Sequence, residues 1–98
     1  IDGGAGSDNI DSGDAIATIE GGDGDDSHTG SIFNDVINGG AGNDTLVGLN
    51  GNDLLNGMDG NDSLVGGSDN DSLLGGAGDD TLDGGTDNDT INGKDGND

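Results

Sequence analysis

The 98-residue chain lacks cysteine, proline, tryptophan and tyrosine, and Phe33 is its only aromatic residue. Without cysteine, no disulfide can stabilise it, although small extracellular domains commonly depend on disulfides. It has no long apolar run, so the sequence predicts neither a transmembrane helix nor a signal peptide. Its stability therefore has to come from another source.

Basic residues are almost absent as well. Lysine and arginine together number one, against 22 acidic residues, and the formal net charge is −21. This excludes nucleic-acid binding and attraction to anionic membranes, because no basic patch exists to meet phosphates. Low hydrophobicity with high net charge is otherwise typical of disordered chains. A chain of this composition could still fold if bound cations neutralised its charge, so the sequence favours a fold that depends on cations.

Glycine is abundant, and all 24 glycines occupy three positions of a nine-residue repeat that begins at Gly3. Ten complete repeats follow without insertion, from Gly3 to Asn92. Glycine fills position 1 in ten of eleven repeats, and positions 2 and 4 in seven each. Because glycine allows positive φ and tight bends, we expect a turn over positions 1 to 6. Asparagine at position 5 fits this turn, since it tolerates left-handed backbone.

Two further columns carry the chemistry. Position 8 is Ile or Leu in ten of eleven repeats and has polar neighbours, which predicts a very short strand with one inward side chain. With so few apolar residues, burial alone offsets little of the entropy lost on ordering the chain. Position 6 is aspartate in ten of eleven repeats, and Ala17 is the exception. The position 6 aspartates are Asp8, Asp26, Asp35, Asp44, Asp53, Asp62, Asp71, Asp80, Asp89 and Asp98.

These columns spell G-G-x-G-x-D-x-U-x, and Gly39 to Val47 is a clean copy. The chain resembles the RTX (repeats-in-toxin) family of secreted bacterial proteins along its whole length. The resemblance implies an all-β fold, a right-handed parallel β-roll with two repeats per coil and Ca²⁺ between stacked turns. We expect residues 1–98 to form one such segment of a larger protein, with residues 11–20 as a degenerate repeat.

The resemblance also implies which groups bind calcium. Oxygen ligands suit Ca²⁺ better than Zn²⁺, and Mg²⁺ fits less well because it demands tighter octahedral geometry and loses water reluctantly. The implied ligands are the position 6 aspartates and turn carbonyls. These carbonyls belong to Gly4, Gly6, Gly22, Gly24, Gly40, Gly42, Gly51, Gly60, Gly76 and Gly78.

If residues 18 apart stack, the aspartates form two columns. One column begins at Asp8 and the other at Ala17, and consecutive members bracket about eight Ca²⁺ positions. Five of these positions lie in the first column and three in the second. The replacement of aspartate by Ala17 damages one further position in the second column.

Some irregular positions have two interpretations. Ile32 and Phe33 replace small turn residues, either to pack against a neighbouring turn or to contact another domain. His28 lies in the inward column between Ile10 and Leu46. Since no cysteine or second histidine accompanies it, we expect a partly buried, hydrogen-bonded core residue and not a metal ligand.

Other departures concern the turns and the surface. Asp69 and Asp87 at position 4 are either harmless substitutions or extra ligand oxygens. Adjacent acids such as Asp25 and Asp26 simply fill turn positions, and no aromatic platform exists for a sugar. We therefore predict no enzymatic activity.

The predicted function is a calcium-binding module that folds when calcium binds. It would act as a folding switch and spacer in a secreted or cell-surface bacterial protein such as a toxin, protease or lipase. The alternative is a structural repeat of a surface layer, an adhesin stalk or an extracellular fibre. Expected partners are calcium ions, flanking domains or further repeats, with lateral or end-to-end self-association as a further option.

Overall fold

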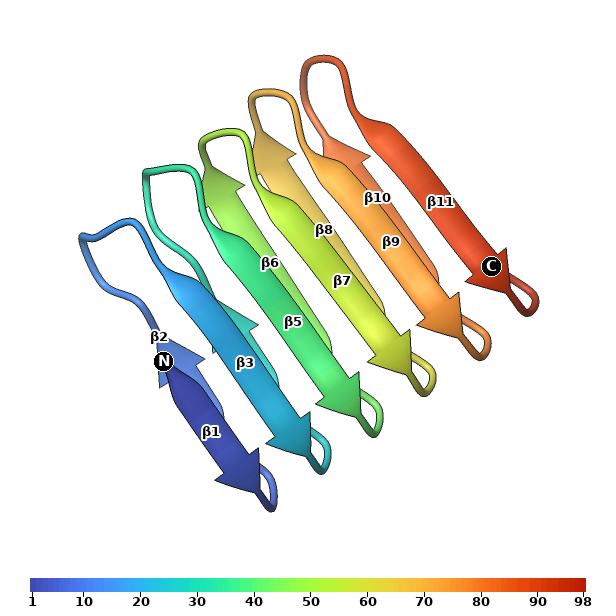
Figure 1. Cartoon of the computed structure of the whole chain (residues 1–98). Coiled ribbons are helices and arrows are strands. Elements are labelled where there is room, and N and C mark those ends of the chain that lie inside the picture. The colour runs from blue at the N-terminus through green and yellow to red at the C-terminus, as the bar shows by residue number, and fades with distance from the viewer.

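The computed structural model describes residues 1–98 and contains eleven strands and no helix (Figure 1). Consequently it has no helix that could cross a membrane. The odd-numbered strands form one parallel sheet, and they are β1 (Asp2–Ala5), β3 (Thr18–Asp23), β5 (Val36–Ala41), β7 (Leu54–Asp59), β9 (Ser72–Ala77) and β11 (Thr90–Asp95). The even-numbered strands form the other, and they are β2 (Asn9–Asp11), β4 (Ser27–Thr29), β6 (Thr45–Asn50), β8 (Ser63–Ser68) and β10 (Thr81–Gly85).

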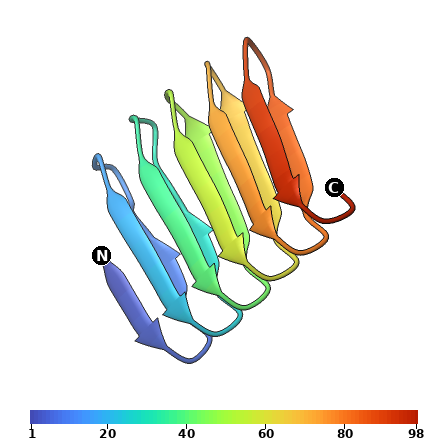
Figure 2. The ribbon, with the colours of Figure 1, turned by 45° about the vertical axis from the view of Figure 1, so that its right-hand side comes forward.

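The two sheets lie face to face, joined by alternating turns at their two margins (Figures 1 and 2). The molecule is a flat slab of 28 × 28 × 12 Å. Every strand pairs in parallel with the strand 18 residues away, as Ile37 with Leu55 and Leu46 with Leu64. Two nonapeptides therefore make one coil, and the predicted parallel β-roll is confirmed.

Most strands are longer than expected, although β2 and β4 have only three residues each. β5 and β7 each run for six residues, through positions 7 to 9 of one repeat and 1 to 3 of the next. Only positions 4 to 6 are left for the turn, so the expected turn over positions 1 to 6 was wrong. The reason is that side chains alternate between faces along a strand. Positions 8 and 1 then both point inward, and burial along Val36–Gly39 alternates accordingly.

The three glycine columns have two different causes. Every glycine at positions 2 and 4 has positive φ, as at Gly40 (122°) and Gly42 (135°). Five non-glycine residues at these positions also keep positive φ, and they are Leu49, Met58, Asp69, Asp87 and Lys94. Position 1 glycines have no positive φ. They are required because a Cβ on Gly57 would contact Oδ2 of Asp62 and the carbonyl oxygen of Gly75.

The apolar core is a single layer of position 8 side chains. The fully buried aliphatic members are Ile19, Ile37, Leu46, Leu55, Leu64 and Leu73. Ile10 and Leu82 are partly buried against them. At the ends of the roll, Ile1 and Ile91 are 60% and 50% exposed, because only one coil covers them. Because each strand contributes at most one buried apolar side chain, buried aspartates and glycine backbone fill the rest of the interior.

Two adjacent glycine positions generate a testable contrast. Gly57→Ala should lower the free energy of unfolding by about 2 to 3 kcal/mol, because the new methyl group overpacks the Asp62 carboxylate. Met58→Ala should change it by about 0.5 kcal/mol or less, since Met58 is exposed and its φ of 83° already belongs to a non-glycine residue. Urea unfolding midpoints of the two variants measure the difference. Equal losses would contradict the packing role assigned to position 1.

Candidate functional site

The position 6 aspartates form two stacked columns at the margins of the roll. Seven of them are only 1–4% exposed, and they are Asp26, Asp35, Asp44, Asp53, Asp62, Asp71 and Asp80. In each column the backbone N–H of one aspartate donates to Oδ1 of the aspartate 18 residues later, as from Asp44 to Asp62 at 2.8 Å. The stacking predicted from the 18-residue spacing is therefore present.

The position 5 residues form a second ladder, in the opposite direction. Asn61 N–H donates to Oδ1 of Asn43, 18 residues earlier, at 2.9 Å, and Asn70 N–H donates to Asn52 at 3.0 Å. No position 5 residue has positive φ. The expectation that asparagine serves a left-handed backbone was wrong, because its side chain instead satisfies the N–H of the next coil. Each turn is thus bound to both of its neighbours.

The second carboxylate oxygen of most of these aspartates has no partner. The buried Oδ2 atoms without any hydrogen bond belong to Asp8, Asp26, Asp44, Asp53, Asp62, Asp71 and Asp80. Burying an unpaired carboxylate oxygen is costly, and buried polar atoms in native proteins nearly always have partners. Protonation or a bound cation would therefore stabilise these seven oxygens.

Backbone oxygens complete the surroundings. Oδ2 of Asp44 contacts the position that a Cβ on Gly39 would take, and the carbonyl oxygen of Gly57 lies 2.8 Å from the same position. The position 4 carbonyls of Gly42 and Gly60 accept no hydrogen bond. No three acidic or histidine side chains cluster together as a metal site would need, so any ion has to draw on backbone carbonyls as well.

The predicted carbonyls fall into two groups. Those at position 4 lie in the three-residue turns beside the aspartates, and they belong to Gly6, Gly24, Gly42, Gly51, Gly60 and Gly78. Those at position 2 lie within strands, and they belong to Gly4, Gly22, Gly40 and Gly76. Free turn carbonyls with buried carboxylates are the oxygen donors that a hard divalent cation prefers. The residues present therefore fit calcium.

One turn satisfies its aspartate without an ion. Ser31 donates to Oδ2 of Asp35 from its backbone N–H at 2.7 Å and from its hydroxyl at 2.9 Å. Oδ1 of Asp35 accepts the N–H of Ala17 at 2.6 Å. Ser31 replaces glycine at position 2, and neither Ser31 nor Phe33 has positive φ. Oδ2 of Asp35 thus has two hydrogen-bond donors, whereas Oδ2 of the other buried position 6 aspartates has none.

The remaining predicted residues lie at the C-terminal end. Asp89 and Asp98 accept the N–H groups of Asp71 and Asp80 through Oδ1, each at 3.0 Å. Asp89 is half-buried and Asp98 is exposed, because no further coil covers them. At position 4, Asp69 accepts the N–H of Gly51 at 3.2 Å, so this substitution adds a contact between coils.

Burial changes the acidity of the central aspartates. Removal from water raises the pKa of Asp53 and of Asp62 to about 6. The N–H bond from the previous coil opposes this, while repulsion from stacked carboxylates, such as Asp44 and Asp80 around Asp62, adds to it. The same burial raises the pKa of Asp44 and Asp71. The ionised form of these aspartates is therefore unfavourable in the folded chain when no cation neutralises it.

His28 is fully buried, as the inward pattern predicted, and lies between Ile10 and Leu46 in the even-numbered sheet. The expectation that it is hydrogen-bonded was wrong, because neither Nδ1 nor Nε2 has a partner. Oδ2 of Asp26 and the carbonyl oxygen of Gly39 lie near Nε2, around Gly21, but neither forms a hydrogen bond with it.

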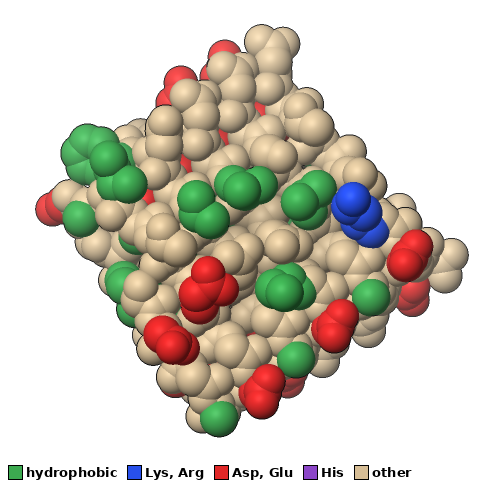
Figure 3. All heavy atoms as spheres, in the orientation of Figure 1, with side chains coloured by type: hydrophobic (Ala, Val, Ile, Leu, Met, Phe, Trp, Pro, Cys, Tyr) green, Lys and Arg blue, Asp and Glu red, His purple; other side chains and the backbone are tan.

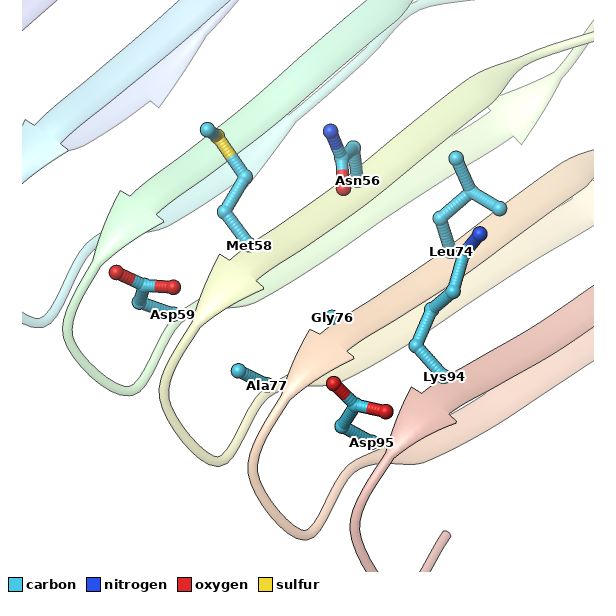
Figure 4. Close-up of a pocket in the computed structure, with 8 residues that line it drawn as sticks. All are labelled: Asn56, Met58, Asp59, Leu74, Gly76, Ala77, Lys94 and Asp95. Carbon is cyan, nitrogen blue, oxygen red and sulfur yellow. The ribbon is translucent and has the colours of Figure 1, made fainter.

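The outer surface is less organised than the interior. Apolar and acidic side chains are scattered over the face of the odd-numbered strands, with a single basic one (Figure 3). An open hollow of about 420 Å³ lies between β7, β9 and β11, where Met58, Leu74 and Lys94 stand up from the sheet (Figure 4). Ile32 and Phe33 are 59% and 41% exposed, so their side chains are not packed into the roll. None of these features reaches the buried carboxylates.

The raised pKa values predict an unusual pH dependence without divalent cations. The pKa of Asp62 is about 6 when folded and about 3.9 when unfolded, so its stabilising contribution is full below pH 3.9 and is lost as pH rises through 6. At pH 7, Asp62→Asn should therefore raise the free energy of unfolding of the metal-free chain, on the order of 2 kcal/mol. The matched variant Asp59→Asn removes an exposed charge and should do much less. Circular dichroism of the metal-free chains during titration with the folding-promoting osmolyte trimethylamine N-oxide compares them, and equal effects would contradict the burial argument.

Comparison with known proteins agrees with this geometry. A family model for the RTX calcium-binding nonapeptide repeat, in four copies, matches residues 29–64 and 65–98, which is well over half of the chain. Comparisons with curated proteins and with solved structures gave no match. The repeats, the parallel roll and the matched residues lead to one conclusion. The chain belongs to the RTX calcium-binding nonapeptide repeat family.

Proposed function

We propose that this chain is a folding switch, which forms its β-roll when calcium binds between stacked turns. The observation that carries the proposal is the set of seven buried Oδ2 atoms without partners. The ligands would be the Oδ2 atoms of the position 6 aspartates and the free position 4 carbonyls. A bound divalent cation would supply the positive charge that these oxygens lack.

Electrostatics explain why folding would wait for calcium. The formal charge is −21, and folding brings aspartates into columns at every coil. Without cations, the stacked carboxylates repel one another and resist burial, as the raised pKa of Asp62 reflects. Binding energy that only the folded state can use then becomes folding energy. The same chain would be disordered at low calcium and ordered at high calcium.

The geometry refines the number of ions. The sequence predicts about eight positions, but the one bounded by Asp35 and Asp53 has a carboxylate oxygen already occupied by Ser31. We therefore expect about seven Ca²⁺, five in the column that begins at Asp8 and two in the other. The N-terminal half of the second column, with Ala17 and Asp35, would hold none.

Such a switch suits a protein that is made at low calcium and works at high calcium. The lack of cysteine fits this arrangement, since calcium would replace disulfides as the extracellular staple. We infer that the module is a secreted or cell-surface spacer within a larger bacterial protein. Flanking non-repeat domains would support this context, and many more repeats in ordered contact would support a fibre or stalk.

Calcium-dependent folding can be observed directly. In excess chelator the chain should show a disordered far-ultraviolet circular dichroism spectrum, and added Ca²⁺ should produce β structure in one cooperative transition. Mg²⁺ at equal concentration should be much less effective, because it demands stricter octahedral geometry. A chain that is fully folded in chelator would refute the switch.

The Ser31 assignment predicts a gain of function. Ser31→Gly restores glycine at position 2 and frees Oδ2 of Asp35, so the number of bound Ca²⁺ should rise by one. Ser12→Gly, in the turn where Ala17 replaces aspartate, is the control and should add none. Equilibrium dialysis with ⁴⁵Ca²⁺ counts the ions. An unchanged count for Ser31→Gly would mean that the Ser31 contacts do not exclude the ion.

A further inference from the structure

One coil differs from the others in what faces its position 1 glycine. A Cβ placed on Gly21 would lie 2.6 Å from Oδ2 of Asp26 and 2.6 Å from Nε2 of His28, and would contact the carbonyl oxygen of Gly39. Both side chains are almost fully buried, at 2% and 0% exposed. Both named atoms lack hydrogen-bond partners.

The same space elsewhere contains only oxygen donors. At Gly39 and Gly57 the three nearest atoms belong to Asp44 or Asp62 and to a backbone carbonyl, and none of them is a nitrogen. The residues paired with the position of His28 on the neighbouring coils are Ile10 and Leu46. The Asp26–His28 pair is therefore a local exception with its own ligand chemistry.

The two unpartnered atoms are well placed to share an ion. Since each lies 2.6 Å from one point, they are at most about 5.2 Å apart, yet they make no hydrogen bond. Zinc bonds to imidazole nitrogen and carboxylate oxygen measure about 2.0–2.2 Å, so two ligands on one ion lie about 3 to 4 Å apart. Even at its upper limit of about 5.2 Å, the separation of the two atoms exceeds that range by little more than about 1 Å.

Ligand type decides which metal fits. Calcium takes oxygen ligands, whereas imidazole suits zinc, copper, iron and nickel. We propose that Asp26 and His28, with the Gly39 carbonyl, form a binding site for one divalent ion of the zinc class, which would displace one of the Ca²⁺ that Asp26 borders while the other turns keep theirs. The proposal rests on the proposed function only in that calcium is used to keep the roll folded.

The test uses the fact that the chain has a single histidine. Protein with ¹⁵N-labelled histidine, folded in excess Ca²⁺, is titrated with ZnCl₂ while the imidazole ¹⁵N resonances and the binding heat are recorded. One equivalent of zinc should shift the Nε2 resonance to that of a metal-bound nitrogen. His28→Leu, which copies the residue at Leu46, should keep calcium-dependent folding and lose this binding event. Asp26→Asn should weaken zinc binding at least about tenfold.

Two results would overturn the site. One is a histidine resonance that zinc leaves unchanged, and the other is an identical zinc isotherm for His28→Leu, which would assign binding to surface carboxylates. Failure of the wild-type chain to fold in Ca²⁺ would contradict the proposed function instead. The zinc titration is then repeated on the chain folded with trimethylamine N-oxide, where a shift of the Nε2 resonance supports the site and an unchanged resonance refutes it.

Discussion

The position 6 carboxylate is the group on which the rest of this structure depends. Its Oδ1 accepts the N–H of the aspartate one coil earlier, and its Oδ2 turns inward without a partner. One side chain thus fixes the spacing between coils and creates the demand for a cation. The thin core, with one aliphatic side chain per strand, cannot replace this interaction.

The same carboxylate explains the glycine pattern. Position 1 must be glycine because Oδ2 of the following aspartate occupies the space of a Cβ, as Asp44 does at Gly39. Positions 2 and 4 mostly need positive φ, and Leu49 and Asp69 show that other residues can be forced into it. Glycine is therefore selected for lack of space at position 1 and for positive φ at positions 2 and 4.

Periodicity predicted the parallel roll, the pairing of residues 18 apart and the two aspartate columns. It could not separate strand from turn, because inward glycines at position 1 carry no apolar signal and resemble turn residues. It also could not reveal that Ser31 closes the Asp35 carboxylate, since this depends on the local path of one turn. The sequence also could not reveal that His28 makes no hydrogen bond, because a buried imidazole is expected to have a hydrogen-bond partner.

The ladders at positions 5 and 6 run in opposite directions, and both connect residues 18 apart. All these contacts stay matched if a whole coil of 18 residues is added or removed, since every turn still meets a turn of its own column. A change of nine residues would instead move Asp62 and Asp80 into the column of Ala17 and Asp35. The unit by which such a roll can lengthen without rearrangement is therefore the coil, twice the length of the repeat that the sequence displays.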